Sequence, residues 1–202
     1  PHVSQAEKKA KMEEWWRTKF ALLIEYGLNL KHVQKVVDSD LIIFRDGVPD
    51  FLDKLRARRI PLIVLSASGL GEEPLVRFFK KHNQLSENVH IISNRFEWAP
   101  DGHATKVLEP IIHSMNKDET VLKNFPFYHK IANRKNVLLL GDSVDDIAMA
   151  FGLEHENLLK VGFWEDENIH DSLDRYKTAF DVVITDDGGY EWVNALLKEL
   201  FG

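Results

Sequence analysis

Short apolar runs alternate with amphipathic segments along the chain after Gly47, and this alternation most constrains the fold. The clearest run is 137–140, where every residue is Val or Leu, so that a strand there would be buried on both faces. Strands of this kind, separated by helices, are typical of a parallel sheet covered by helices on each side. The sequence therefore predicts an α/β fold with a Rossmann-like three-layer parallel sheet.

The expected elements follow one another without an internal repeat. Period and composition predict strands at 60–65, 89–92, 137–140, 158–161 and 182–184. They also predict helices at 4–26, 30–37, 48–58, 72–82, 107–115, 145–151, 166–177 and 190–201. The first two helices precede the alternating part, which indicates a helical segment ahead of the sheet-containing core.

Composition narrows the class of protein. The 202 residues are 44% apolar and 29% charged, as in an ordinary globular protein with one core. The net charge of -6 argues against nucleic acid or an anionic membrane as a partner, but a small phosphate needs only a local positive site. The absence of cysteine excludes disulfides and thiolate metal sites, which fits the cytoplasm. No apolar run approaches the roughly 20 residues of a membrane span, and no signal peptide is evident.

Acidic residues follow the most apolar predicted strand. Gly141 and Asp142 come directly after Leu140, and Asp146 lies one helical turn further on. Ligands bind beyond the carboxyl ends of parallel strands, and carboxylates placed there suit Mg²⁺. Alternatively, Asp142 caps the next helix and Asp146 is a favourable acid in its first turn. The apolar strand before them favours the metal site.

A second polar turn, Ser66-Ala67-Ser68-Gly69, follows the predicted strand at 60–65. Its hydroxyl and backbone N–H groups are able to hold a phosphoryl oxygen, although a plain serine-glycine loop is the alternative. Its expected place at the same sheet edge as Asp142 favours phosphate binding. Lys117 is a candidate for the fixed cation of such a site, and its alternative is a solvated lysine after a helix.

Together, these residues resemble a known set of motifs. Ser66, Lys117 and the Gly-Asp-Ser-x-x-Asp string at 141–146 resemble the second, third and fourth motifs of the haloacid dehalogenase superfamily. Similarity to the cytosolic pyrimidine 5'-nucleotidases runs from about Met12 to the C-terminus. It is carried by Met12-Glu13-Glu14-Trp15-Trp16, Arg45-Asp46-Gly47, Phe51-Leu52-Asp53-Lys54-Leu55, Ile60-Pro61, Ile112-His113-x-x-Asn116-Lys117 and Leu139-Leu140-Gly141-Asp142-Ser143. The combination is specific, whereas each segment alone is not.

The resemblance implies a Mg²⁺-dependent 5'-nucleotidase. Such an enzyme hydrolyses pyrimidine or 7-methylguanosine nucleoside monophosphates to nucleoside and phosphate through an aspartyl-phosphate. By the resemblance, Asp142 ligates Mg²⁺ and Asp146 supports the metal through water or hydrogen bonds. Ser66 and the Ala67 backbone hold phosphoryl oxygens, and Lys117 neutralises the nucleophile and the transferring group.

The family's first motif, a strand followed by Asp-x-Asp-x-Thr, is absent from these residues. We expect this motif, with the nucleophilic aspartate, to lie upstream, and the chain alone to be inactive. Residues 1–44 are then part of a helical cap, and residues 45–202 form a phosphatase core that lacks its first strand. We expect a monomer.

Two further departures affect the substrate site. Lys19 stands where the family tends to have a substrate-contacting serine, and we assign Lys19 to the substrate site. Ser68 stands where these nucleotidases usually have glycine. Trp15, Trp16 and Phe20 are candidates for stacking on a base, but we expect at least two of the three to pack inside the cap.

Two other functions remain open from the sequence. One is a phosphatase of the same superfamily that acts on a non-nucleotide monophosphate. The other is a non-catalytic protein that binds nucleotides and lacks the nucleophile in its natural form. The retained types of Ser66, Lys117 and Asp142 favour the nucleotidase.

Overall fold

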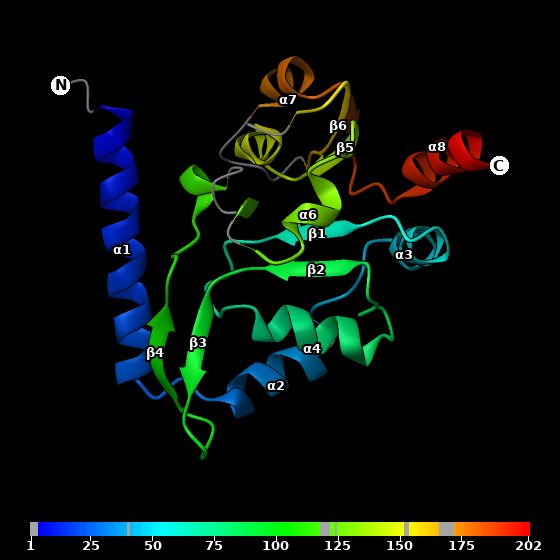
Figure 1. The fold of residues 1–202 in the computed structure, drawn as a ribbon. Coiled ribbons are helices and arrows are strands. Elements are labelled where there is room, and N and C mark those ends of the chain that lie inside the picture. Colours follow the sequence, from blue (N-terminus) through cyan, green and yellow to red (C-terminus); the bar gives the residue numbers. More distant parts are fainter. Residues whose placement is uncertain (1–3, 40, 118–121, 124, 152–153, 166–171) are drawn as a thin grey trace. The chain divides into compact units, whose positions relative to one another are not determined.

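The computed structural model describes residues 4–39, 41–117, 122–123, 125–151, 154–165 and 172–202, and the chain divides into two compact units (Figure 1). The first unit combines Pro1–Ile43 with Leu62–Asn116, and the second combines Phe44–Pro61 with Lys117–Gly202. Within the described ranges, every helix is too short or too polar to cross a membrane. The division into a cap at 1–44 and a core at 45–202 stays a prediction.

The first unit opens with a long helix whose ends are set by local sequence. Helix α1 (Gln5–Glu25) begins after Ser4, whose hydroxyl accepts the Glu7 N–H at 3.3 Å. The Glu7 carboxylate accepts the Ser4 N–H at 2.8 Å, which completes a capping box. The helix ends before Gly27, whose φ of 75° suits glycine. Helix α2 (Leu30–Asp38) follows, and both helices match the predicted ranges.

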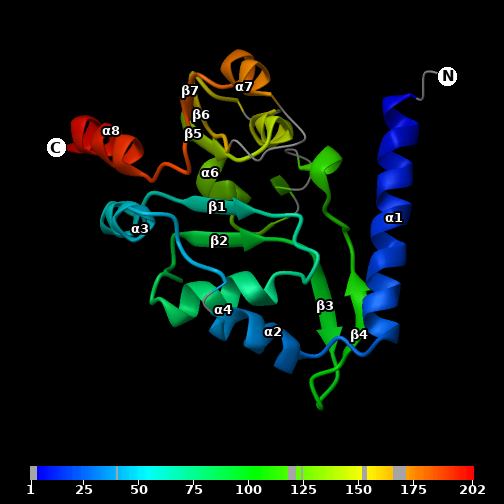
Figure 2. The same ribbon diagram turned by 180° about the vertical axis from the view of Figure 1, so that it is seen from behind.

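Helix α1 packs on an antiparallel hairpin, as the two opposite views agree (Figures 1 and 2). The hairpin consists of β3 (Arg95–Trp98) and β4 (Ala104–Leu108). The buried side chains between helix and hairpin are Phe20, Leu28, Phe96, Ala104 and Ile111, with Trp16 packed against them. Trp16 and Phe20 therefore pack inside this unit, as expected, whereas Trp15 is 57% exposed.

The prediction of a helix at 107–115 is wrong. Strand β4 extends to Leu108, where Val107 pairs with Phe96, and only a short 3₁₀ turn, η1 (Ser114–Asn116), follows. Pro110 explains why no helix forms across this range, because proline lacks the N–H and clashes with the preceding turn. Strand β4 forms instead as the second strand of a local hairpin with β3.

A parallel pair of strands completes the first unit. Strand β1 (Leu62–Leu65) pairs with β2 (Val89–Ile92), and α4 (Glu73–Lys81) connects them. Helix α4 lies beside α2, where Lys81 Nζ donates to the Val37 carbonyl at 2.8 Å. Strand β1 pairs on one side only among the described strands.

The second unit contains a parallel sheet of three strands in the order β5 (Asn136–Gly141), β6 (Asn157–Phe163) and β7 (Val182–Ile184). Its described helices are α3 (Val48–Ala57), α6 (Tyr128–Ile131), the 3₁₀ helix η2 (Val144–Ala150), α7 (Leu173–Ala179) and α8 (Glu191–Phe201). Leu139, Ala150, Tyr176 and Phe180 form a buried cluster that joins the sheet to η2 and α7. The parallel strands and alternating helices confirm a mixed α/β fold.

Replacing Phe20 by alanine tests the packing of α1. Phe20 is fully buried, so Phe20→Ala is expected to lower the free energy of unfolding by about 3–5 kcal/mol in urea denaturation. Leu22 lies on the same helix and is 47% exposed, so Leu22→Ala should change that free energy by less than about 1 kcal/mol. Equal losses in the two variants would contradict this packing.

Candidate functional site

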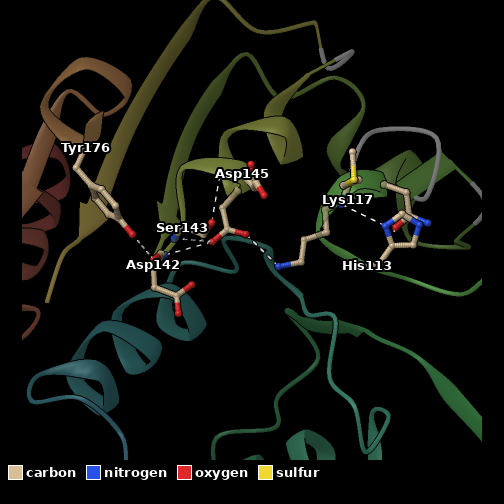
Figure 3. Close-up of polar contacts among 9 residues, drawn as sticks. His113, Lys117, Asp142, Ser143, Asp145 and Tyr176 are labelled. Atoms are coloured by element: carbon tan, nitrogen blue, oxygen red, sulfur yellow. Dashed lines mark hydrogen bonds and ion pairs between the residues drawn. The ribbon is translucent and has the colours of Figure 1, made fainter. Parts of the chain in front are cut away.

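The carboxyl end of β5 turns into η2 through a set of side-chain caps (Figure 3). The Ser143 hydroxyl accepts the Asp145 N–H at 3.2 Å, so Ser143 rather than Asp142 caps this helix. Asp146 Oδ2 accepts the N–H groups of Asp142 and Ser143, each at 3.2 Å. Asp146 is thus an acid in the first turn, as the alternative held, whereas the alternative that Asp142 caps the helix is wrong.

Gly141 allows the Asp146 carboxylate to reach back over the end of the strand. A Cβ atom on residue 141 would lie 2.8 Å from Asp146 Cβ and 3.0 Å from its Oδ2. Real Cβ atoms do not approach other atoms so closely, so any larger residue would displace Asp146. Glycine is required here by the close approach of a side chain.

Lys117 and Asp146 form a buried ion pair. Lys117 Nζ lies 3.0 Å from Asp146 Oδ1, and the two side chains are 16% and 5% exposed. Lys117 is therefore no solvated lysine, which was the alternative for this position. Desolvating two charges is costly, so the pair persists only with good geometry and additional hydrogen bonds, which the two backbone N–H groups supply to Asp146.

The backbone of Asp142 is held on both sides. Its N–H donates to Asp146, and its carbonyl accepts the hydroxyl of Tyr176, a fully buried residue of α7. Figure 3 shows the Asp142 carboxylate pointing away from the Tyr176 ring. The side chain is thus presented from a fixed main chain.

The electrostatic surroundings of Asp142 disfavour its negative charge. Although Asp142 is an exposed residue by surface area, partial desolvation by the protein raises the pKa of its carboxyl group, and repulsion from Asp146 raises this pKa further. Lys117 acts in the opposite direction. One lysine therefore offsets two carboxylates only in part.

These two carboxylates fit a divalent cation. Mg²⁺ prefers oxygen ligands and usually takes one or two carboxylates together with water and substrate oxygens. Asp146 is already engaged by Lys117 and two N–H groups, so Asp142 is the carboxylate more available to a cation, and its role as a ligand stays a prediction. Among the described residues no three His, Cys, Asp or Glu side chains are grouped for a metal, so further ligands would have to come from elsewhere.

The turn after β1 in the first unit is fixed by Asn94, a fully buried residue. Asn94 Nδ2 donates to the carbonyls of Ser68 at 3.2 Å and Ile112 at 3.0 Å, and its Oδ1 accepts the Ile112 N–H at 2.8 Å. The sequence analysis missed Asn94. Its signal is a polar residue that follows an apolar strand, as Ser66 follows β1.

Lys19 lies against this turn. Its Nζ is 4.5 Å from the Trp16 ring centroid and 5.5 Å from that of Trp15. A Cβ atom on Gly69 would lie only 2.5 Å from Lys19 Nζ, so the ammonium group contacts the turn directly. The structure thus brings Lys19 to the segment that contains Ser66 and Ala67, while their role in binding stays a prediction.

The predicted site residues divide between the units. Ser66, Ala67 and Lys19 belong to the first unit, and Lys117, Asp142 and Asp146 to the second. Each group is assembled within its own unit. That the two groups form a single site stays a prediction.

His113, which belongs to the motif that ends at Lys117, is a fully buried titratable residue. Its Nδ1 accepts the Met115 N–H at 3.2 Å, and its Nε2 is buried without a partner among the described residues. Burial lowers the pKa of His113. The imidazole is therefore neutral near pH 7 and serves to hold the turn before Lys117.

Removing Lys117 should leave Asp146 as an uncompensated buried charge. Lys117→Met is expected to lower the free energy of unfolding by about 1.5–3 kcal/mol, measured by urea denaturation near pH 7. Lys135→Met is the matched control, because Lys135 faces Glu154 at 3.7 Å and the Glu154 side chain is 91% exposed. A loss in the control as large as in Lys117→Met would refute the importance of burial.

The lowered pKa of His113 predicts a pH dependence of stability. Below about pH 6.5 the unfolded chain binds a proton that the folded chain does not, so the free energy of unfolding falls as the pH decreases. The slope from this residue is at most about 1.4 kcal/mol per pH unit. The free energy of unfolding of the wild type and of His113→Asn is measured by urea denaturation between about pH 5 and pH 8. We expect this free energy to change less steeply with pH in the variant. Parallel curves would exclude His113 as the cause.

The sequence profile of one family, described as pyrimidine 5'-nucleotidase (UMPH-1), matches residues 1–201. The 7-methylguanosine phosphate-specific 5'-nucleotidase of Mus musculus is 32% identical over 203 residues, which cover 99% of the chain and 66% of that protein. The enzyme of the same name from Drosophila melanogaster is 31% identical over 200 residues, covering 98% of the chain and 61% of that protein. The chain thus spans somewhat less than two thirds of these relatives.

A solved structure shows the same relationship in three dimensions. The crystal structure of cytosolic 5'-nucleotidase IIIB bound to cytidine superposes with a TM-score of 0.68 and 31% identity. The match covers 76% of the chain and 51% of that protein. The family profile, the relatives and the fold agree with one another. The chain belongs to the pyrimidine 5'-nucleotidase (UMPH-1) family.

Proposed function

We propose that this chain, in its full-length form, is a Mg²⁺-dependent 5'-nucleotidase for pyrimidine or 7-methylguanosine nucleoside monophosphates. The observation that carries the proposal is the buried Lys117–Asp146 ion pair beside Asp142 at the carboxyl end of β5. A buried lysine and two adjacent carboxylates are the groups that a metal-assisted phosphoryl transfer requires. Family membership supports the same reaction.

Asp142 would hold Mg²⁺. Asp146 would support the metal indirectly, because its hydrogen bonds orient the turn that carries Asp142. Bound Mg²⁺ would offset negative charge on the phosphoryl group and polarise its oxygens. Lys117, fixed by Asp146 at 3.0 Å, would neutralise the nucleophile and the transferring group. The nucleophile would be an aspartate upstream of these residues, which forms an aspartyl-phosphate that water then hydrolyses.

The first unit would supply the substrate contacts. Ser66 and the Ala67 N–H would hold phosphoryl oxygens, with Lys19 beside them. The half-exposed Trp15 ring lies next to Lys19 and is free to stack on a base, which contributes on the order of 1–3 kcal/mol. The relative solved with cytidine supports a nucleoside subsite in this family member.

The proposed fold is a Rossmann-like three-layer sheet that includes an upstream strand. Strands β1 and β5 each pair on one side only among the described strands, and each ends at predicted site residues. The upstream strand would carry the nucleophilic aspartate. Residues 45–202 would then form the core and residues 1–44 part of the cap. The cytosolic names of relatives support a cytoplasmic location, and the monomer stays a prediction.

Phosphate release by the full-length protein tests the proposal. We expect release from CMP, UMP or 7-methyl-GMP with Mg²⁺, and a loss of at least about 100-fold in kcat for Asp142→Asn. Asp145→Asn should keep most of the activity, because Asp145 is exposed and makes no side-chain contact with Lys117 or Asp146 among the described residues.

Other outcomes would replace the proposal. Release from a sugar phosphate or phosphoamino acid, without release from nucleotides, would indicate a phosphatase for a different substrate. Binding of nucleotides without any release would indicate a non-catalytic protein. Release that is indifferent to Asp142→Asn would remove the assigned role of this carboxylate.

A further inference from the structure

We propose that Arg45 holds the ring of Tyr190 beside Asp142, so that Arg45 and Tyr190 are positioning residues of the candidate metal site. The proposal rests on the proposed function for the role of Asp142. It assigns a task to the segment Arg45-Asp46-Gly47, which the proposed reaction leaves unused. All of these residues belong to the second compact unit.

The Arg45 side chain joins the carboxyl ends of two strands. Its Nη2 lies 2.6 Å from Oε1 of Glu165, which follows β6, and its Nη1 lies 2.5 Å from Oδ1 of Asp187, which follows β7. The same Nη1 donates to the Gly188 carbonyl at 3.1 Å. Each ion pair is partly exposed and contributes little alone. One planar guanidinium group binds both carboxylates, however, and so fixes the two strand ends relative to each other.

The turn after β7 has a backbone conformation that needs such contacts. Asp186 and Asp187 are consecutive residues with positive φ, 59° and 53°. This conformation is unfavourable for residues other than glycine and persists only where surrounding contacts determine it. Arg45 binds both the Asp187 side chain and the Gly188 carbonyl. The shape of the turn therefore depends on Arg45.

Main-chain contacts fix the start of α8 beside α3, and the two helices are neighbours in both views (Figures 1 and 2). The Asp46 carbonyl accepts the Tyr190 N–H at 2.7 Å. Asn194 Nδ2 donates to the Gly47 carbonyl at 2.8 Å. A Cβ atom on Gly189 would lie 2.7 Å from the Asp46 carbonyl oxygen, so this close approach requires glycine. These contacts set the position of the Tyr190 main chain.

The Tyr190 ring lies in an aromatic stack at the end of β6. It is stacked on the Phe163 ring, with the centroids 5.0 Å apart and an angle of 19° between the planes. Phe51 of α3 contacts the Tyr190 ring edge-on, at a centroid distance of 5.3 Å. The Arg45 guanidinium carbon lies 5.2 Å from the Phe163 centroid, within the range of a cation–π contact. Arg45 therefore holds both the turn before Tyr190 and the ring on which Tyr190 packs.

The strand register brings this stack to Asp142. Gly141 pairs with the residue that precedes Phe163, so Asp142 and Phe163 lie side by side where β5 and β6 end. Burial raises the pKa of the Tyr190 hydroxyl to about 12, against the effect of Arg45, and the negative charge of Asp142 adds to the increase. The register and the electrostatics thus agree that Tyr190 lies near Asp142.

In this position the ring shields Asp142 from water. An aromatic surface lowers the local dielectric constant, and the attraction between a carboxylate and a divalent cation increases as the dielectric constant falls. Mutation of residues that support a metal ligand without contacting the metal commonly changes metal affinity by about 10–100-fold. Tyr190 therefore tunes how strongly Asp142 holds a cation, and Arg45 keeps Tyr190 in place.

Binding of Mn²⁺ to the full-length protein tests the proposal. Mn²⁺ takes the same kinds of oxygen ligand as Mg²⁺, and its electron paramagnetic resonance signal reports the concentration of the unbound ion. We expect Tyr190→Ala and Arg45→Met each to weaken Mn²⁺ binding at least about tenfold. Tyr190→Phe should keep most of the affinity, because the ring remains.

Two controls separate positioning from stability and from charge. Val193→Ala removes buried methyl groups from α8 and destabilises the fold, but it should leave the Mn²⁺ affinity unchanged. Arg56→Met removes an exposed arginine of α3 that pairs with Asp53 at 2.5 Å, and so changes the net charge as Arg45→Met does. It should also leave the affinity unchanged. Losses in these controls as large as those in Arg45→Met would overturn the inference.

A double-mutant cycle tests whether Arg45 acts through Tyr190. We expect Arg45→Met to weaken Mn²⁺ binding in the wild type but to add little in Tyr190→Ala. Losses that add up in the double variant would mean that Arg45 acts separately, and its assigned role would be wrong.

Thermal melting of each variant shows whether it is folded, and Arg45→Met decides alone if Tyr190→Ala does not fold. Wild-type Mn²⁺ affinity in folded Arg45→Met or folded Tyr190→Ala would overturn the inference and leave the proposed function standing. Mn²⁺ binding that Asp142→Asn leaves unchanged would remove both proposals. The expected affinities, without phosphate release from any monophosphate, would keep the positioning role and remove the nucleotidase.

Discussion

A carboxylate buried at the end of a strand must be neutralised, and the geometry of the second unit follows from how this chain neutralises Asp146. Lys117 supplies the charge and the N–H groups of the following turn supply hydrogen bonds. Gly141 leaves the space that Asp146 needs. The same contacts fix the main chain of Asp142 and leave its carboxylate free for a cation. The contacts that stabilise Asp146 therefore also position Asp142.

The two units present complementary chemistry. By the proposed function, the first holds phosphate at the turn after β1, beside Lys19. The second offers two carboxylates that one lysine offsets only in part, which suits a divalent cation. The proposed reaction uses both kinds of group, and the chain belongs to the pyrimidine 5'-nucleotidase (UMPH-1) family.

The sequence predicted features that neighbouring residues determine. Ser4 and Gly27 mark the ends of α1, and the run at 182–184 coincides with β7. The types of Asp142 and Lys117 indicated the candidate site, and the structure brings Lys117 to Asp146 beside Asp142. The hairpin of β3 and β4 escaped prediction although its strands are close in sequence, and Pro110 argues against the helix expected at 107–115. Asn94 and Tyr176 also escaped, because their roles arise only when tertiary contacts bring them to Ser68 and Asp142.

The proposed function requires that phosphate binds beside a metal ion held by Asp142. Mn²⁺ binds the same kinds of oxygen ligand as Mg²⁺, and its unpaired electrons relax nearby nuclei with a steep dependence on distance. The most direct measurement is therefore the ³¹P relaxation of phosphate bound to the full-length protein with Mn²⁺. The account predicts strong relaxation that Asp142→Asn abolishes. Bound phosphate whose relaxation is unchanged by Mn²⁺ would contradict it.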